Sequence, residues 1–133
     1  MDENEISKHI VDSAFRLHMR LGPGLFEHVY EEILAYELVK RGLPVKQQEP
    51  IPLIYDDLRI ELAFKADLLV NNLVIVELKS VVKLADIHKK QVLTYLKISN
   101  LRLGLLINFN ETLIKDGIVR IANGMPRPTR GAM

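Results

Sequence analysis

Cysteine is absent from the 133-residue chain, which excludes both a disulfide framework and a thiolate metal site. This absence fits a reducing compartment, and we expect a cytoplasmic protein. No apolar run approaches the roughly 18 residues that span a bilayer, so we expect no membrane partner. The acidic, polar start of the chain is unlike a signal peptide, which begins basic and then turns apolar. Neither sign of charge is in large excess, because the net charge is only +1. A polyanion such as nucleic acid would therefore have to be held by a local patch of positive charge.

The composition that remains is that of one globular domain. Hydrophobic residues make up 48% of the chain and charged residues 26%, the ordinary balance of a soluble protein with a single core. We assign residues 1–124 to this domain. Residues 125–133 contain two prolines, two arginines and little to bury, so they are predicted to be a disordered tail.

Three segments have apolar residues at helical spacing. The predicted helices span about 2–21, 25–41 and 84–99. Asp2 with Glu5 resembles a capping box at the start of the first helix, and a glycine-proline-glycine break ends it.

Strand character appears between the second and third helices and again after the third. The predicted strands span 45–55, 58–70, 73–79 and 101–108, and a hairpin follows at 112–121. Pro50 and Pro52 cannot donate to a ladder, so the first strand is predicted to lie at an edge of the sheet. Apolar and polar residues alternate over 58–64, which predicts a half-buried strand there, and Asp116-Gly117 predicts the turn of the last hairpin.

Two charges end an otherwise apolar strand. After the β-branched run 74–76, Glu77 and Lys79 share one face of the strand, while Leu78 points the other way. Asp67 lies near the end of the neighbouring strand. Two carboxylates on adjacent strands suit Mg²⁺, which stabilises charge on a phosphate and lowers the pKa of a bound water. A lysine beside them can orient that water or offset phosphate charge. Taken singly, each of these charges is more typical of a strand end or turn that emerges into water.

Two helical pairs add further polar groups. Glu27 and Tyr30 lie one turn apart at the start of the second helix, and Gln91 and Tyr95 lie at i and i+4 in the third. Glu27 also has a structural explanation, because an acid at a helix N-terminus contributes about 0.3–1 kcal/mol. Tyr95 has one too, as a core aromatic residue with its hydroxyl at the rim. Gln91 is expected to need a partner, since its amide is predicted to lie on the face that meets the sheet.

Together these residues carry a resemblance to a known family. The order of an early glutamate, an aspartate, Glu-x-Lys and Gln-x-x-x-Tyr resembles the PD-(D/E)XK nuclease superfamily, and the last element is similar to that of its exonuclease-type branch. The chain more closely resembles the GxxExxY family, whose name is spelled by Gly24, Glu27 and Tyr30. This similarity covers roughly residues 5–122. One departure is that alanine, rather than proline, precedes Asp67.

The resemblance implies a fold, a cofactor and a set of roles. The fold is an α/β, restriction-endonuclease-like core in which helices flank a central mixed β-sheet. The function is that of a Mg²⁺- or Mn²⁺-dependent nuclease that hydrolyses DNA phosphodiester bonds. The implied metal ligands are Asp67, Glu77 and the carbonyl of Leu78. The implied catalytic or supporting groups are Lys79 as the catalytic lysine, Glu27 as an additional acid near the metal, and Gln91 and Tyr95.

A second hypothesis is a non-catalytic module that keeps the nuclease fold and binds nucleic acid or a protein. The near-zero net charge favours this hypothesis, whereas the complete set of metal and lysine positions favours an enzyme. In either case we expect nucleic acid to contact a patch formed by Lys83, Lys89, Lys90 and Tyr30. Lys97 would extend this patch. The choice between DNA and RNA, and a homo-oligomer, stay open at this stage.

Side-chain parity sets one geometrical requirement. A two-residue turn at 71–72 would pair Asp67 with Val76 and would put Asp67 on the face opposite Glu77. One metal ion requires Asp67 directly across from Glu77. The metal site therefore needs an odd-length connection, most simply 71–73, or a β-bulge before the turn.

Overall fold

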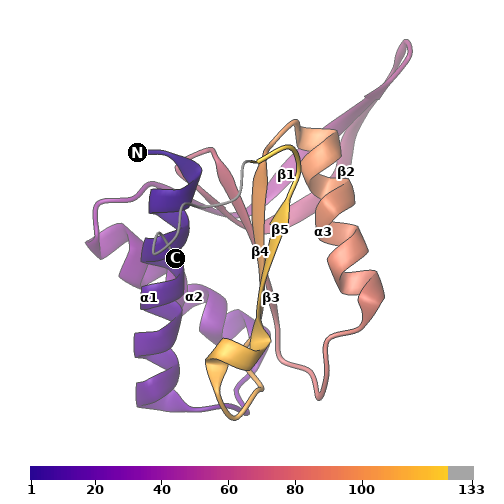
Figure 1. Cartoon of the computed structure of the whole chain (residues 1–133). Coiled ribbons are helices and arrows are strands. Elements are labelled where there is room, and N and C mark those ends of the chain that lie inside the picture. Colours follow the sequence, from indigo (N-terminus) through magenta and orange to yellow (C-terminus); the bar gives the residue numbers. More distant parts are fainter. Residues whose placement is uncertain (126–133) are drawn as a thin grey trace.

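A mixed five-stranded sheet with helices on both faces forms the centre of the computed structural model, which describes residues 1–125 (Figure 1). In chain order the elements are α1 (Glu3–Leu21), α2 (Glu27–Lys40), β1 (Val45–Tyr55), β2 (Leu58–Val70), β3 (Val74–Lys79), α3 (Asp86–Ser99), β4 (Leu103–Asn108), a 3₁₀ helix (Ile114–Gly117) and β5 (Ile118–Ala122). The predicted α/β class, with a central mixed sheet between helices, is confirmed.

The strands follow one another across the sheet in the order β1-β2-β3-β4-β5. Neighbouring strands are antiparallel except β3 and β4, which are parallel and are joined by α3. Such a parallel pair needs a crossover connection, and a helix supplies it. The proline-containing strand β1 lies at the edge, as predicted, and β4 is buried along its whole length.

The two faces of the sheet carry separate apolar cores. Val74, Val76 and Leu78 of β3 pack in the core shared with α1 and α2. Ile75 packs on the other face, with residues of α3. Because side chains alternate along a strand, Glu77 follows Ile75 onto the α3 face. The sheet thus separates the α1–α2 layer from the layer that contains Glu77.

The connection between β2 and β3 has the odd length that the metal site requires. Val70 pairs with Val74, so the loop consists of the three residues 71–73, and the Leu73 N–H donates to the Val70 carbonyl. Asn71 and Asn72 both have left-handed backbone, with φ near +53° and +56°. Asparagine tolerates this conformation better than most residues. The prediction of a three-residue connection is confirmed.

The prediction of a terminal hairpin at 112–121 is wrong. Residues 114–117 form a 3₁₀ helix, and only 118–122 are extended and pair with β4. A Cβ atom at Gly117 would lie 2.4 Å from the Asn108 carbonyl oxygen, so the helix packs directly against the end of β4. This close approach, together with the burial of Ile114, leaves no room for a free hairpin turn.

The far end of the β1–β2 hairpin projects from the body of the domain (Figure 1). We call residues 53–62 the arm. The predicted half-buried strand over 58–64 is wrong for most of its length, since Phe64 alone is buried and residues 58–63 are exposed. The reason is that β3 pairs with β2 only at 68–70, so no third strand or helix among residues 1–125 covers the arm.

The predicted tail at 125–133 lies outside the described residues, apart from Met125. Within the described part of the chain, no helix combines the length and the apolar character needed to cross a membrane.

Candidate functional site

Asp67 and Glu77 face each other where β2 and β3 separate. The ladder ends at the pair Leu68–Val76, and Asp67 and Glu77 come next in the same register. Beyond this pair, backbone N–H groups of the two strands donate to side-chain carboxylates instead of to backbone carbonyls. The Asp67 N–H donates to the Glu77 carboxylate at 3.2 Å, and the Leu78 N–H donates to the Asp67 carboxylate at 2.9 Å. The two carboxylates are therefore held close together in the fork between the strands.

Glu77 is a buried carboxylate beside a second acid. Its exposed fraction is 8%. Burial, followed by the negative charge of Asp67, raises the pKa of Glu77 to about 8, while the Asp67 N–H and the charge of Lys79 oppose the shift. Both main causes disfavour the ionised form. A cation bound between the two carboxylates would reverse that balance.

Lys79 lies two residues beyond Glu77 on the same face of β3. Its backbone is held by the neighbouring strand, because the Lys79 carbonyl accepts from the Phe109 N–H at 2.9 Å. Its side chain is half-buried and makes no ion pair or hydrogen bond with residues 1–125. The ammonium group is thus positioned beside the carboxylates without being neutralised.

Helix α3 contributes Tyr95 to the site. The Tyr95 ring stacks on Phe64, with the ring centroids 3.9 Å apart. Burial raises the pKa of the Tyr95 hydroxyl, and Glu77 and Asp67 raise it further. Tyr95 therefore lies within electrostatic range of both carboxylates.

Gln91 is placed differently from the expectation. It precedes Tyr95 by one turn of α3, but it is exposed and its amide has no partner among the described residues. The prediction that the Gln91 amide faces the sheet and hydrogen-bonds a partner there is therefore wrong. Its spacing from Tyr95 still puts it on the same side of α3, open to solvent.

Glu31, which the sequence analysis did not single out, is the acid of α2 that connects to the site. Glu27 is exposed and has no hydrogen bond or ion pair within the described chain, whereas Glu31 is 8% exposed. The Gln48 amide bridges the two carboxylates, donating to Glu31 at 2.6 Å and to Asp67 at 3.1 Å. Gln48 has a positive φ of 49°, which no residue type in this stretch signals. The only signal for Glu31 was its i,i+4 spacing from Glu27.

Asn108 is a second residue that the sequence analysis missed. This fully buried side chain accepts from the Val81 N–H at 3.1 Å and donates to the Val81 carbonyl at 2.9 Å. It also lies beside Lys79 in the parallel register of β3 and β4. Asn108 thus fixes the chain immediately after Lys79. A polar residue at the end of a fully apolar strand was the available signal.

Tyr30 does not lie where a nucleic-acid contact requires. Its side chain is fully buried, its ring stacks on Phe109, and its hydroxyl donates to the Gly22 carbonyl at 2.6 Å. The same hydroxyl accepts from the Leu25 N–H at 3.2 Å. Tyr30 therefore holds the turn between α1 and α2, and its burial contradicts the expected contact with nucleic acid.

The expected lysines are accessible. Lys83 in the loop before α3, and Lys89 and Lys90 in its first turns, are exposed, as is Lys97 near the helix end. None forms an ion pair with another described residue. They are available to phosphate groups on the α3 side of the sheet.

The fork between β2 and β3 holds two carboxylates rather than a larger acidic cluster. In residues 1–125, no group of three or more histidine, aspartate or glutamate side chains is arranged to hold a metal ion. The predicted position of Glu27 beside the metal is therefore not seen. A cation here would use Asp67, Glu77, backbone carbonyls and water.

Comparison with known protein families gives one match. The model of the PD-(D/E)XK nuclease superfamily matches residues 4–121, and this range includes every residue of the site described above. No curated protein and no solved structure matches the chain significantly.

Proposed function

Because the chain belongs to the PD-(D/E)XK nuclease superfamily, we propose that it is a divalent-metal-dependent nuclease that hydrolyses phosphodiester bonds of DNA. The observation that carries this proposal is the opposition of Asp67 and Glu77 across the fork between β2 and β3, with Lys79 on the same face as Glu77. The family match favours nuclease chemistry, and the geometry supplies the groups for it.

The donor atoms suit Mg²⁺ or Mn²⁺. Hard divalent cations prefer oxygen ligands, and Mg²⁺ commonly takes one or two carboxylates while water fills its other positions. A dication would offset the repulsion that keeps Glu77 protonated. We propose that Asp67, Glu77 and the carbonyl of Leu78 hold it. When bound, the ion stabilises charge on the scissile phosphate and lowers the pKa of a coordinated water.

Lys79 is proposed as the catalytic lysine. Its unpaired ammonium can donate a hydrogen bond to the attacking water or to a phosphate oxygen, and its positive charge offsets the charge that develops in the transition state. The anchoring of the Lys79 backbone to Phe109 restricts where the ammonium can reach. This positioning is what a preorganised catalytic group needs.

The remaining polar groups have supporting roles in the proposal. Tyr95 lies near both carboxylates and can donate its hydroxyl to one of them or to the substrate. Gln91 and Glu27 are open to solvent, so they would act on bound substrate rather than on the empty site. Glu31 acts through Gln48, which orients the Asp67 carboxylate. The exposed lysines around α3 would bind the phosphate backbone.

Within the superfamily we assign the chain to the GxxExxY family, on Gly24, Glu27 and Tyr30. The burial of Tyr30 gives a structural reason for the tyrosine of that motif, because its hydroxyl binds the Gly22 carbonyl in the turn. The alternative function is a non-catalytic module of the same fold, which the low net charge of +1 favours.

A cleavage assay separates these functions. Linear, circular and single-stranded DNA, and an RNA of the same sequence, would be incubated with the protein and Mg²⁺ or Mn²⁺. We expect DNA cleavage that chelation abolishes and that Lys79→Ala reduces by at least about a hundredfold. Lys115→Ala, at an exposed lysine of the 3₁₀ helix, is the matched control. DNA binding without cleavage under every metal condition would favour the non-catalytic module, and cleavage of RNA alone would change the substrate.

A further inference from the structure

The arm presents an apolar face that nothing in residues 1–125 covers. Tyr55 and Leu58 are 69% and 59% exposed, and Ile60 and Leu62 are also exposed. Tyr55 pairs with Leu58, and Leu53 pairs with Ile60, so these side chains share one face of the ribbon. A two-stranded ribbon is marginal on its own, and a contiguous exposed apolar face marks a contact surface. The arm therefore requires a partner.

The charge of the arm restricts what that partner is. The arm contains three acids and one arginine, so its net charge is −2. Arg59 pairs with Glu61 at 2.6 Å within the arm. Asp56 and Asp57 at the tip form no ion pair or hydrogen bond with other described residues. Acidic side chains repel phosphate, so the arm is unsuited to nucleic acid and suited to a surface that is both apolar and basic.

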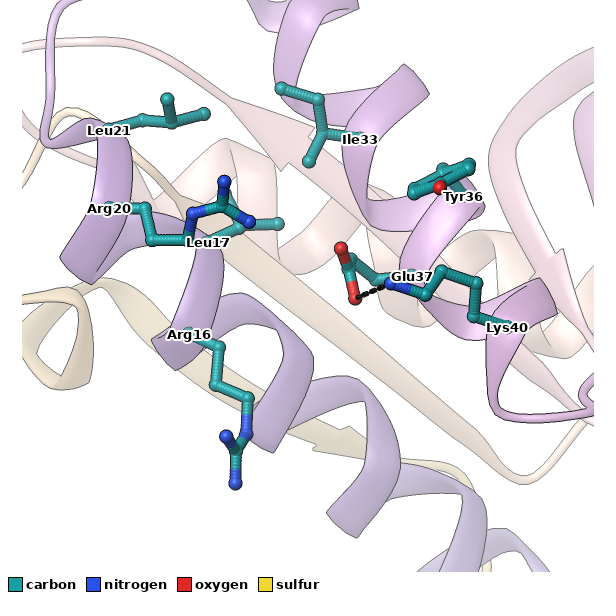
Figure 2. Close-up of a pocket in the computed structure, with 8 residues that line it drawn as sticks. All are labelled: Arg16, Leu17, Arg20, Leu21, Ile33, Tyr36, Glu37 and Lys40. Atoms are coloured by element: carbon teal, nitrogen blue, oxygen red, sulfur yellow. Dashed lines mark ion pairs between the residues drawn. The ribbon is translucent and has the colours of Figure 1, made fainter.

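Such a surface lies between α1 and α2 of the same chain. A groove of about 440 Å³ lies between the two helices. In Figure 2, Leu17 and Arg20 of α1 lie across from Ile33 and Tyr36 of α2. Three cations and one acid line it, which gives a net charge of +2. Two of the cations are already paired, Arg16 with Asp12 and Lys40 with Glu37, whereas Arg20 has no ion pair within the described chain. The groove thus combines an apolar floor with one unpaired cation, Arg20.

We propose that the chain self-associates by docking the arm of one copy into the α1–α2 groove of a second copy. Tyr55 and Leu58 would cover the apolar floor, and Asp56 and Asp57 would meet Arg20. Reciprocal docking about a two-fold axis contains this contact twice, which favours reaching the roughly 1,200–2,000 Å² of a stable interface. Neither surface includes a residue of the metal site, so the proposal is independent of nuclease activity.

Sedimentation velocity over about a hundredfold range of protein concentration tests self-association. We expect the wild type to associate, and Tyr55→Ser combined with Leu58→Ser to weaken the association at least about tenfold. Leu113→Ser, at an exposed leucine outside both surfaces, is the matched control. A wild type that stays monomeric throughout, or an arm variant that associates like the wild type, would overturn the proposal.

A charge exchange tests that arm and groove meet each other. Asp56→Lys with Asp57→Lys changes the arm from −2 to +2, and Arg20→Glu with Lys40→Glu changes the groove from +2 to −2. Each double variant is expected to weaken association at least about tenfold, and the quadruple variant to restore it. Circular dichroism verifies that each variant is folded. Failure of the quadruple variant to associate better than either double variant contradicts arm-in-groove docking.

Discussion

Glu77 is a buried acid whose surroundings disfavour its ionised form. It is buried, it lies against Asp67, and its carboxylate accepts a backbone N–H at the point where the strands separate. Burial followed by the charge of Asp67 raises its pKa to about 8. A buried acid beside a second acid destabilises the metal-free protein, and a cation bound between the two carboxylates would offset that cost.

Glu77→Gln is expected to stabilise the metal-free protein and to remove metal binding. A neutral amide carries no charge to desolvate, and its oxygen can still accept from the Asp67 N–H. Thermal unfolding in a chelator at pH 7 should therefore show a melting temperature several degrees above that of the wild type. Calorimetric titration should show no Mn²⁺ binding. Undiminished Mn²⁺ affinity in Glu77→Gln would exclude Glu77 as a ligand.

The pH dependence of metal-free stability should report the same group. In the folded state the pKa of Glu77 is about 8, above the ordinary value of 4.5 that applies when the chain is unfolded. The contribution of the protonated carboxyl is therefore fully present below about pH 4.5 and is lost as the pH rises through about 8. The difference in melting temperature between Glu77→Gln and the wild type should grow across this window. A difference that stays constant from pH 5 to pH 9 would contradict the shifted pKa.

At the scale of elements, the sheet register brings the site together and α3 covers it. The three-residue connection sets Asp67 across from Glu77, and the parallel pair β3–β4 sets Lys79 beside Asn108. Helix α3 packs tightly against β4 at Gly104, where an added Cβ atom would lie 2.8 Å from Val92 Cγ1. This close contact holds the helix that carries Tyr95.

Gly104→Ala is expected to destabilise the protein by about 1–3 kcal/mol through overpacking against α3. Without the clash, alanine in a strand would instead be neutral or stabilising. Val92→Ala removes the obstructing methyl group, so the double variant should lose less stability than the sum of the two single variants. Urea unfolding of the four proteins measures this coupling. Additive losses would show that Gly104 is not needed for the helix–sheet contact.

The helices and the apolar strands were predictable because each buries a regular stripe or face, and the edge position of β1 was predictable from its two prolines. Parity limited the connection before β3 to an odd length, most simply 71–73, or a β-bulge, if Asp67 was to lie opposite Glu77, and the structure has the three-residue connection. The exposure of the arm was not predictable in this way. Alternation over 58–64 indicates which side chains share a face, but it does not indicate whether another element covers that face.

The site itself was predictable only in part. Asp67, Glu77 and Lys79 lie on adjacent strands and carry ionisable groups, so the sequence pattern identifies them. Glu31 and Asn108 depend on contacts between distant segments, formed through Gln48 and through the loop after β3. The burial of Tyr30 likewise depends on Phe109, 79 positions further along the chain.

At the scale of the whole molecule, the sheet divides the protein into two working surfaces. Glu77 and the exposed lysines of α3 belong to one side, where we propose that nucleic acid binds, and Asp67 lies across the fork from Glu77, linked through Gln48 to Glu31 of α2. The groove between α1 and α2 lies on the other side, where we propose that a second copy docks. Self-association through that groove would leave the α3 face open to substrate.

The most direct test of the metal site is the position of bound Mn²⁺ in a crystal, located by its anomalous scattering. We expect one ion in the fork between β2 and β3, at about 2.0–2.3 Å from carboxylate oxygens of both Asp67 and Glu77. Glu77→Gln crystals soaked in the same way should lack it. An ion bound elsewhere, or no ion in this fork at a Mn²⁺ concentration that saturates binding in solution, would contradict the account.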